Sequence, residues 1–321
     1  MTRRLGVIMD ALDHIKAYKD TTVGLLREAQ RRNYQIDYLE AGDLELRNQD
    51  LFGHARRMAV HSSDTSWCTL DTPRAIAMAD LDVILMRKDP PFNMGYIYTT
   101  YLLEHAERAG VLVVNKPASL RDANEKLFTT WFSQCTPPTL VTCRQRALRE
   151  FLAEYKDIVV KPLDGMGGAS IFRVTSQDPN INVIFETMTA YEERFMMAQS
   201  YLPAIRDGDK RILMIDGEPV PYALARIPAP GESRGNLAAG GRGVGQPLSE
   251  SDRKICALVG PTLRAKGLLF VGLDVIGDAL TEINVTSPTG LRELDTAFHL
   301  NIAEQLFDAI ERRIEAIAKP S

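Results

Sequence analysis

Three oxygen-bearing side chains near the carboxyl end of the chain have the spacing of a divalent-cation site. Asp274 and the segment Glu282-Ile283-Asn284 lie in two apolar runs, separated by the turn-forming residues Gly277-Asp278-Ala279. Residues two apart on a strand share a face, so Glu282 and Asn284 point the same way. Carboxylate and amide oxygens are ligands that Mg²⁺ prefers, with phosphates and waters completing its coordination. We therefore expect a metal site on this hairpin.

The register of the hairpin decides whether Asp274 shares that face. A three-residue turn would pair Ile276 with Leu280 and place Asp274 opposite Glu282. A two-residue turn would pair Asp274 with Thr281 and leave Glu282 on the other face, so the metal hypothesis requires the three-residue turn. The alternative interpretation is a solvated polar face. Apolar residues on both strands indicate burial instead, and buried carboxylates need cations.

A lysine followed by a glycine-rich turn forms a second candidate site. Residues 161–170 read Lys-Pro-Leu-Asp-Gly-Met-Gly-Gly-Ala-Ser. Glycines allow backbone N–H groups to surround phosphate oxygens, and Lys161 would add a positive charge beside them. The spacing is not that of a Walker loop, and no helix follows. The segment is therefore either a phosphate-binding turn or a plain glycine-rich hairpin.

Residues 227–246 form a glycine-rich tract between a strand that ends at Arg226 and a helix that begins near Ser249. Six of its twenty residues are glycine, and Arg234 and Arg242 are spaced through it. Such a tract cannot pack a core of its own, so it is either a linker or a mobile lid. The arginines favour a lid, because guanidinium groups can hold phosphoryl or carboxylate oxygens once water is excluded.

A strand-like segment at residues 196–203 ends in Tyr201-Leu202-Pro203. Its backbone groups could bind a flat heterocycle, although an ordinary core strand explains the same pattern. The charged segment 207–211 follows it. That segment is either a plain turn or the place where a ribose and phosphates bind.

The elements that must position these groups change in character along the chain. The first third alternates strand and helix patterns, which predicts a mostly parallel, doubly wound sheet. The expected strands are 5–9, 36–39, 81–86 and 111–114, and the expected helices are 21–32, 96–109 and 119–133. Ligands bind such sheets at the carboxyl ends of the strands. The polar segments Arg87–Pro91 and Asn115–Pro117 lie at such ends.

Beyond Thr136-Pro137-Pro138 the strands come in pairs, which predicts an α+β half with antiparallel sheets. The expected pairs are 158–162 with 170–174, 212–215 with 222–226, and 270–275 with 280–285. Turn signals separate the members of the last two pairs. The fold class is therefore α/β followed by α+β.

The composition limits the functions that are open to this chain. Its 321 residues suggest about two domains, and 45% hydrophobic with 25% charged residues is typical of a globular protein. A net charge of −4 gives no basis for nucleic-acid binding. Neither a C-x-x-C pair nor a paired-histidine motif is present, so any metal needs oxygen ligands. No apolar stretch is long enough for a membrane span, so we expect a cytoplasmic protein with reduced cysteines.

A set of longer motifs resembles a known family. The motifs are Asp89-Pro90-Pro91-Phe92, Asn115-Lys116-Pro117, Asn124-Glu125-Lys126-Leu127, and residues 161–168, 235–242 and 281–290. With them the chain resembles bacterial glutathione synthetase, a member of the ATP-grasp superfamily. The resemblance runs from the first strand to the last helix.

This resemblance implies a fold of three parts with ATP between the last two. A doubly wound pre-ATP-grasp domain over 1–125 would precede a central subdomain over 126–203 and a C-terminal subdomain over 204–318, with the lid at 227–246. The implied reaction joins γ-glutamylcysteine and glycine to form glutathione, ADP and phosphate, through an acyl phosphate on the cysteinyl carboxylate. Another ATP-grasp ligase, of the D-alanine–D-alanine or glutamate-adding type, and a non-catalytic ATP-binding module are the alternatives.

The resemblance also implies roles for individual residues. The metal, Mg²⁺ or else Mn²⁺, would be held by Asp274, Glu282 and Asn284. The catalytic residues would be Arg211, Arg226 and Asn284. ATP would be bound by Lys126, Lys161, Gly165, Met166, Gly167, Gly168, Gln199, Tyr201, Leu202, Asp209 and Arg211. The substrates would be contacted by Arg87, Asn115, Arg234, Gly240, Gly241, Arg242 and Thr289. A homotetramer is implied as well, with no nucleic-acid or membrane partner.

Two segments depart from the family pattern. The lid opens on Ile227-Pro228-Ala229-Pro230-Gly231, where a more polar segment is usual, and Gly290 stands where relatives often have a bulkier residue. Either difference could alter the fit of the acceptor. Neither touches the expected metal or phosphate groups.

Overall fold

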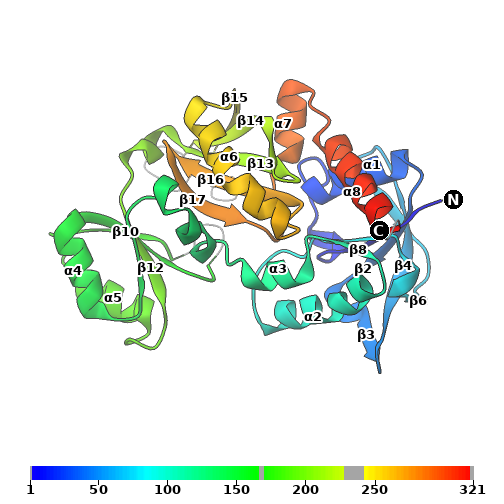
Figure 1. The fold of residues 1–321 in the computed structure, drawn as a ribbon, viewed down its shortest axis with the longest axis horizontal. Coiled ribbons are helices and arrows are strands. Elements are labelled where there is room, and N and C mark those ends of the chain that lie inside the picture. The colour runs from blue at the N-terminus through cyan, green and yellow to red at the C-terminus, as the bar shows by residue number, and fades with distance from the viewer. Residues whose placement is uncertain (1, 166–169, 228–241, 319–321) are drawn as a thin grey trace.

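The computed structural model describes residues 2–165, 170–227 and 242–318. Within these residues the strands form three sheets, of eight, four and five strands. Figure 1 shows the four-stranded sheet with its helices at one end of an elongated molecule, the five-stranded sheet in the middle, and the eight-stranded sheet at the other end. Short 3₁₀ segments connect several elements, at Leu12–His14, Ala41–Asp43, Met78–Asp80, Leu127–Cys135 and Pro203–Asp207.

One half of the first sheet is parallel and doubly wound, as predicted. Its strands are β1 (Arg4–Ile8), β2 (Gln35–Leu39), β7 (Val83–Met86) and β8 (Leu112–Val114), in the order β2-β1-β7-β8. Helix α1 (Thr21–Arg31) connects β1 to β2, and α2 (Met94–Arg108) connects β7 to β8. Asp20 caps α1 by accepting a hydrogen bond from the Val23 N–H, and Asn93 caps α2 in the same way at Tyr96.

The other half of the first sheet is antiparallel, so the expectation of a mostly parallel sheet was wrong there. It contains β3 (Leu44–Arg47), β4 (Asp50–Val60), β5 (Cys68–Leu70) and β6 (Arg74–Ala77). Strand β4 pairs antiparallel with β2 and carries the other three strands on its edges. Arginines in β4 and β6 interrupt the alternation of apolar and polar residues that indicates a strand. Two of them, Arg57 and Arg74, pair with the buried carboxylate of Asp37.

The predicted helix over 119–133 is interrupted. Helix α3 (Pro117–Asp122) ends before Asn124, and the 3₁₀ segment begins at Leu127. The Asn124 side-chain oxygen accepts hydrogen bonds from the N–H groups of Lys126 (3.1 Å) and Leu127 (2.9 Å). Because an asparagine that bonds to nearby backbone N–H groups competes with helical bonding, the helix breaks here. The break leaves Glu125 and Lys126 in an irregular link.

The second sheet is antiparallel and small. Its strands are β9 (Thr139–Thr142), β10 (Asp157–Pro162), β11 (Phe172–Thr175) and β12 (Met196–Ser200), in the order β11-β10-β12-β9. Helices α4 (Gln145–Tyr155) and α5 (Ile181–Thr189) cover one face of it (Figure 1). Their apolar residues, including Leu148 and Phe185, pack on β10 and β12 in a separate core.

The third sheet is also antiparallel and carries most of the predicted site. Its strands are β13 (Asp209–Ile215), β14 (Glu218–Ile227), β15 (Arg242–Pro247), β16 (Phe270–Ile276) and β17 (Ala279–Asn284), in the order β15-β14-β13-β16-β17. Helix α6 (Glu250–Ala265) packs against it and begins with a capping box between Ser249 and Asp252. The expected strand pairs of this half are present.

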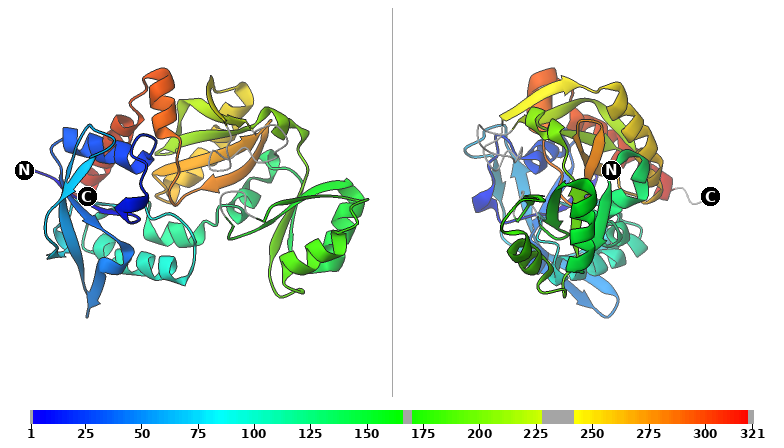
Figure 2. Two further views of the ribbon diagram at one scale, coloured as in Figure 1. Left: turned by 180° about the vertical axis from the view of Figure 1, so that it is seen from behind. Right: turned by 90° about the vertical axis from the view of Figure 1, so that its left-hand side faces the viewer.

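The last two helices return the chain to the first sheet. After α7 (Leu291–Phe298), helix α8 (Ile302–Ala318) lies beside α1, as Figures 1 and 2 show from opposite sides. The Phe307 ring meets Tyr34 at a centroid distance of 5.4 Å. Arg32 at the end of α1 pairs with Asp308 (2.6 Å) and Glu311 (3.0 Å) of α8. The carboxyl end of the chain thus shares a core with the amino-terminal sheet.

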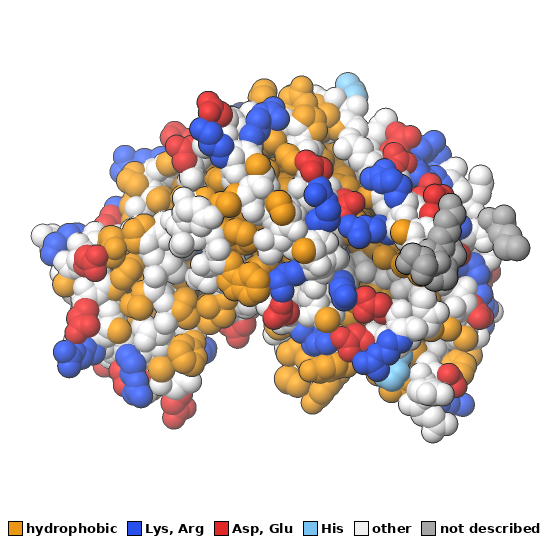
Figure 3. Space-filling model, viewed as in Figure 1, with side chains coloured by type: hydrophobic (Ala, Val, Ile, Leu, Met, Phe, Trp, Pro, Cys, Tyr) orange, Lys and Arg blue, Asp and Glu red, His pale blue; other side chains and the backbone are white. Residues whose placement is uncertain are grey.

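Acidic and basic side chains are interspersed over the face shown in Figure 3. Among the described residues, none of the helices combines the length and the apolar content that crossing a bilayer requires.

Candidate active site

The hairpin of β16 and β17 brings Asp274 opposite Glu282, but by a route that the sequence analysis did not predict. The turn has two residues, because Ile276 pairs with Ala279 and Val275 with Leu280. A β-bulge then shifts the register, so that Thr281 is an extra residue and Asp274 pairs with Glu282. The expected three-residue turn was wrong, whereas the predicted pairing of Asp274 with Glu282 is confirmed.

Asp274 is the centre of a buried ion-pair cluster. It accepts hydrogen bonds from Arg211 Nη2 (2.9 Å) and from Asn284 Nδ2 (3.2 Å), and it lies 2.9 Å from Arg226 Nη2. Arg226 also pairs with Asp209 through its Nε atom (3.0 Å). Burial opposes ionisation of Asp274, but the two guanidinium groups outweigh it and hold the pKa of Asp274 below its ordinary value. The cluster is therefore charged and internally balanced.

A glycine makes room for one of these guanidinium groups. Gly272 lies on β16, and a Cβ atom there would come within 2.8 Å of Arg211 Cδ and 3.1 Å of Pro288 Cβ. Arg211 thus lies flat across β16 and reaches Asp274 as well as the carbonyl oxygen of Thr289, which is 3.4 Å from Nη1. Any larger residue at position 272 would displace the Arg211 side chain.

Two lysines from different elements converge on Glu282. Lys126 comes from the irregular link, and its Nζ lies 3.5 Å from Glu282 Oε1 and 2.6 Å from the carbonyl oxygen of Gly165. Lys161 comes from β10, and its Nζ lies 3.3 Å from the carbonyl oxygen of Thr281, the bulge residue. Burial is the main reason why the pKa of Lys161 falls to about 8. An anion brought to this point would restore its full charge.

A polar group that the sequence analysis did not assign lies next to Lys126. Glu125 accepts a hydrogen bond from Thr286 Oγ1 (3.0 Å), and its backbone carbonyl accepts one from the Ile283 N–H (2.8 Å). Burial first, and the Glu282 carboxylate second, raise the pKa of Glu125. The only sequence signal for it was its position beside Lys126 in the motif 124–127.

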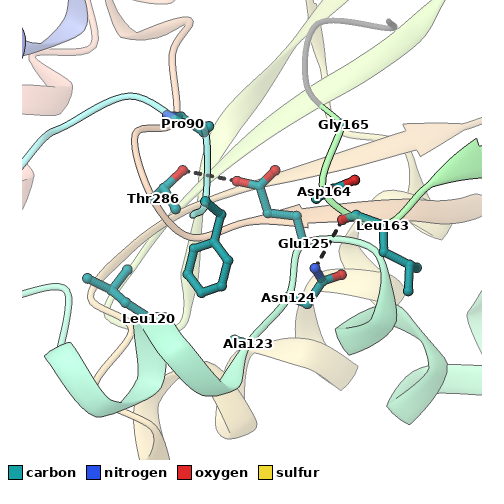
Figure 4. Close-up of a pocket in the computed structure, with 10 residues that line it drawn as sticks. Pro90, Leu120, Ala123, Asn124, Glu125, Leu163, Asp164, Gly165 and Thr286 are labelled. Atoms are coloured by element: carbon teal, nitrogen blue, oxygen red, sulfur yellow. Dashed lines mark hydrogen bonds between the residues drawn. The ribbon is translucent and has the colours of Figure 1, made fainter. Parts of the chain in front are cut away.

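Glu125 lines a pocket between the segment that follows β7, the irregular link and the start of the glycine-rich turn (Figure 4). We call it the Glu125 pocket; it is lined by Pro90, Phe92, Leu120, Ala123, Asn124, Glu125, Leu163, Asp164, Gly165 and Thr286. Asn124 closes one side by donating a hydrogen bond to the Leu163 carbonyl oxygen (3.0 Å). The lining residue Gly165 accepts a hydrogen bond from Lys126, so the pocket adjoins the lysine that faces Glu282.

The residues expected to bind the nucleotide base lie at the end of β12. Gln199 is buried and donates a hydrogen bond to Thr139 Oγ1 (3.0 Å). The Tyr201 N–H bonds to the Asp157 carbonyl oxygen (3.0 Å), and the Leu202 carbonyl accepts from the Ile205 N–H (3.1 Å). Asp209, expected at the ribose, is held by Arg226 as described above. The structure places these residues, and their role with a nucleotide stays a prediction.

The residues expected to contact the substrate lie at the carboxyl ends of β7 and β8. Arg87 is buried and donates hydrogen bonds to Thr22 Oγ1 (3.1 Å) and to the Pro288 carbonyl oxygen (3.0 Å). Asn115 is also buried. Its Nδ2 donates to the carbonyl oxygens of Phe270 and Val285, both at 2.7 Å, and its Oδ1 accepts from the Phe270 N–H (2.9 Å). Asn115 therefore connects β8 to β16, and its contact with a substrate stays a prediction.

Several expected site residues fall outside the described residues. These are Met166, Gly167, Gly168, Arg234, Gly240 and Gly241, together with most of the expected lid over 227–246. Arg242 is exposed and begins β15, whose Gly245 lies against Phe298 of α7.

The donor set on the hairpin is compatible with a hard divalent cation. Glu282 and Asn284 offer oxygens on the face where Asp274 lies, and Glu282 remains partly open at 22% side-chain exposure. Over residues 2–165, 170–227 and 242–318, no group of three or more His, Cys, Asp and Glu side chains is arranged around a metal position. The predicted metal ligands are two carboxylates and one amide, that of Asn284. The Asp274 carboxylate among them is also paired with Arg211 and Arg226.

Comparisons with known proteins agree with this architecture. The chain matches the family model for the prokaryotic glutathione synthetase N-terminal domain over residues 4–121 and the model for the ATP-grasp domain of the same enzymes over residues 125–299. A solved ATP-grasp ligase, PsnB complexed with its minimal precursor, is similar with a TM-score of 0.64 at 18% identity, over 99% of this chain and 100% of that one. The fold and the site define a ligase of the ATP-grasp class.

The particular family follows from sequence relatives. The glutathione synthetase of Pseudomonas syringae pv. tomato is 59% identical over 316 residues, covering 98% of this chain and 99% of the relative. That of Escherichia coli K12 is 57% identical over 312 residues, covering 97% and 99%. The chain belongs to the prokaryotic glutathione synthetase family. Its function is the ATP-dependent formation of glutathione.

Proposed function

We propose that this enzyme joins γ-glutamylcysteine to glycine through an acyl phosphate. The observation that carries the proposal is the convergence of Lys126, Lys161, Arg211 and Arg226 on the acidic face of the β16–β17 hairpin. Among the described residues, four largely buried cations meet carboxylates here, without a protein nucleophile at the centre. Such an arrangement suits phosphoryl transfer, where catalysis consists of positioning and charge stabilisation.

The first step transfers the γ-phosphoryl group of ATP. A cysteinyl carboxylate oxygen forms a bond to the γ-phosphorus, the bond from that phosphorus to the β–γ bridging oxygen breaks, and ADP leaves. Lys126 and Lys161 would hold the phosphate oxygens. Arg211 and Arg226 would stabilise charge on the transferred group. A Mg²⁺ ion, or Mn²⁺ in its place, held by Asp274, Glu282 and Asn284 would supply charge neutralisation at the phosphates.

The second step forms the peptide bond. The glycine amine attacks the acyl carbon, the bond from that carbon to the phosphate oxygen breaks, and phosphate leaves as the amine loses a proton. Arg211 spans Asp274 and the Thr289 carbonyl, so it can stabilise the oxyanion of the tetrahedral intermediate. Because an acyl phosphate reacts with water, a lid over the site is expected, and residues 227–246 with Arg234, Gly240, Gly241 and Arg242 are our candidate.

The nucleotide would lie between the second and third sheets, with Gln199, Tyr201 and Leu202 at the base, Asp209 at the ribose, and Gly165–Gly168 over the phosphates. Arg87 and Thr289 would contact the dipeptide. The proposal also includes the three-part division at 1–125, 126–203 and 204–318, a homotetrameric assembly, and a cytoplasmic location without nucleic-acid or membrane partners.

A coupled assay tests the proposal. Purified protein with ATP, Mg²⁺, γ-glutamylcysteine and glycine should release ADP, phosphate and glutathione in equal amounts. Omission of γ-glutamylcysteine or of glycine should stop ADP release. Phosphate should carry one ¹⁸O atom when the cysteinyl carboxylate is ¹⁸O-labelled, because the acyl phosphate oxygen comes from that carboxylate. Equal ATP turnover with D-alanine alone, or unlabelled phosphate, would contradict it.

A further inference from the structure

Glu125 presents a carboxylate that lacks a cationic partner. One of its oxygens accepts the Thr286 hydrogen bond, and the other has no hydrogen-bond partner among the described residues. In Figure 4 that second oxygen points away from Thr286, on the side of the pocket that faces the glycine-rich turn. Over the same residues, no lysine or arginine forms an ion pair with Glu125. Lys126, its neighbour in the chain, is engaged with Gly165 and Glu282. A carboxylate in this setting favours a cation.

A buried hydroxyl group lies near this carboxylate. Tyr96 is 3% exposed, and its hydroxyl oxygen has no hydrogen-bond partner within the described residues. Its ring packs on Phe92 of the Glu125 pocket at a centroid distance of 5.3 Å. Besides burial, the charges of Glu125, Arg87 and Asp89 act on this hydroxyl group. A buried hydroxyl without a partner is costly, and a polar ligand atom would satisfy it.

Arg87 supplies the opposite charge. Its guanidinium group has five N–H donors, of which Thr22 and the Pro288 carbonyl each occupy one. Burial lowers the pKa of Arg87, which shows that the surrounding Asp20 and Asp89 only partly compensate its charge. An anion next to Arg87 would be favourable.

One short segment connects these groups to the reaction centre. Thr286 donates to Glu125, the Pro288 carbonyl accepts from Arg87, and the Thr289 carbonyl accepts from Arg211. The carboxylate and the guanidinium group therefore contact residues two apart on one segment, and Arg211 of the ion-pair cluster contacts the next residue. A dipeptide could reach from one to the other.

We propose that Glu125, together with Arg87 and the Tyr96 hydroxyl group, recognises the α-ammonium and α-carboxylate groups at the free end of the γ-glutamyl group. Glu125 accepts a hydrogen bond from the α-ammonium group, and Arg87 donates to the α-carboxylate. The proposal rests on the proposed function and names the residues that recognise the γ-linkage. An α-linked dipeptide carries its ammonium and its distal carboxylate on different carbons, so it would not fit the same pair of charges.

Two substrate analogues test the assignment. N-Glutaryl-cysteine lacks only the α-ammonium group, and 4-aminobutanoyl-cysteine lacks only the α-carboxylate. We expect the native enzyme to prefer γ-glutamylcysteine over each by at least about tenfold in kcat/KM. Glu125→Gln should raise the KM for γ-glutamylcysteine at least about tenfold, because a buried charged partner is lost, and should leave kcat/KM for N-glutaryl-cysteine unchanged. Glu125→Asp should keep part of the preference.

The controls separate recognition from a structural role. Asp122→Asn removes an exposed carboxylate from the end of α3 that does not line the pocket, and it should leave the preference intact. An equal loss for γ-glutamylcysteine and N-glutaryl-cysteine in Glu125→Gln would make Glu125 a purely structural residue and overturn the assignment. A native enzyme that forms no glutathione from γ-glutamylcysteine would instead refute the proposed function, before any variant is compared.

Tyr96→Phe tests the same site if Glu125→Gln does not fold. It keeps the ring and removes the hydroxyl group that lacks a protein partner, so the melting temperature should not fall. We expect a higher KM for γ-glutamylcysteine and unchanged KM values for ATP and glycine. An unchanged KM for γ-glutamylcysteine would contradict the proposal.

Discussion

The ion-pair cluster around Asp274 and the Glu125 pocket use the same kinds of side chain in opposite ways. In the cluster, Asp274 and Asp209 are both paired with arginines, so the charges are balanced before any ligand arrives. At the pocket and beside it, Glu125 and Tyr96 have polar atoms without partners among the described residues, and the charge of Arg87 is only partly compensated. The two regions are joined by the segment 286–289.

This difference separates two tasks. Groups that stabilise charge in a transition state must be rigid beforehand, and mutual ion pairs give them that rigidity. Groups that select a ligand must instead keep donors and acceptors without a protein partner. A ligand that cannot bond to them leaves them buried and unpaired, and it therefore binds more weakly. We therefore expect substitutions in the cluster to affect kcat and stability, and those in the pocket to affect KM.

The largest effect is expected on the acidic face of the hairpin. Glu282→Gln should lower kcat by about 10²–10³-fold, because the variant loses the charge that faces Lys126 and Lys161 and that would bind the metal. The glutathione-forming assay measures the loss, and circular dichroism should show an unchanged fold. Glu218→Gln, an exposed carboxylate in the same sheet, is the control. Full activity in Glu282→Gln would remove Glu282 from the site.

A smaller but clear effect is expected on stability. Arg226→Met should lower the free energy of unfolding by about 3–5 kcal/mol, because it leaves Asp209 and Asp274 short of a buried cationic partner. Chemical denaturation measures the change. The matched substitution Arg264→Met breaks an exposed pair with Glu218 and should cost about 1 kcal/mol or less. An equal loss in the free energy of unfolding for the two variants would show that the buried cluster contributes no more to stability than an exposed ion pair.

The smallest effect concerns pH. Because the pKa of Lys161 lies at about 8, its positive charge is lost as the pH rises through that value. The KM for ATP should therefore rise between pH 7 and pH 9, and Lys161→Arg should remove the rise. The unfolded lysine binds its proton up to a higher pH, so the contribution of Lys161 to the free energy of unfolding increases from about pH 8 upward. A KM that stays flat in the native enzyme would contradict the assignment.

Sequence reasoning identified much of the cluster but little of the pocket. Asp274, Glu282 and Asn284 were found because residues alternate along a strand, and Lys126 and Lys161 because they lie in extended motifs. The pairing of Asp274 with Glu282 was predicted through the wrong turn, since a bulge at Thr281 is invisible in hydrophobic alternation. The antiparallel half of the first sheet was missed for a related reason, because arginines there pair with a buried carboxylate.

The sequence by itself determined the class of the fold, the family and the chemical groups available for phosphoryl transfer, because local periodicity and contiguous motifs carry that information. The tertiary structure alone decided which of those groups are paired and which stay open. Arg87 meets Pro288 across 201 residues of chain, and Glu125 meets Thr286 across 161. Contacts of that range depend on how three sheets pack against one another, and no local pattern encodes them.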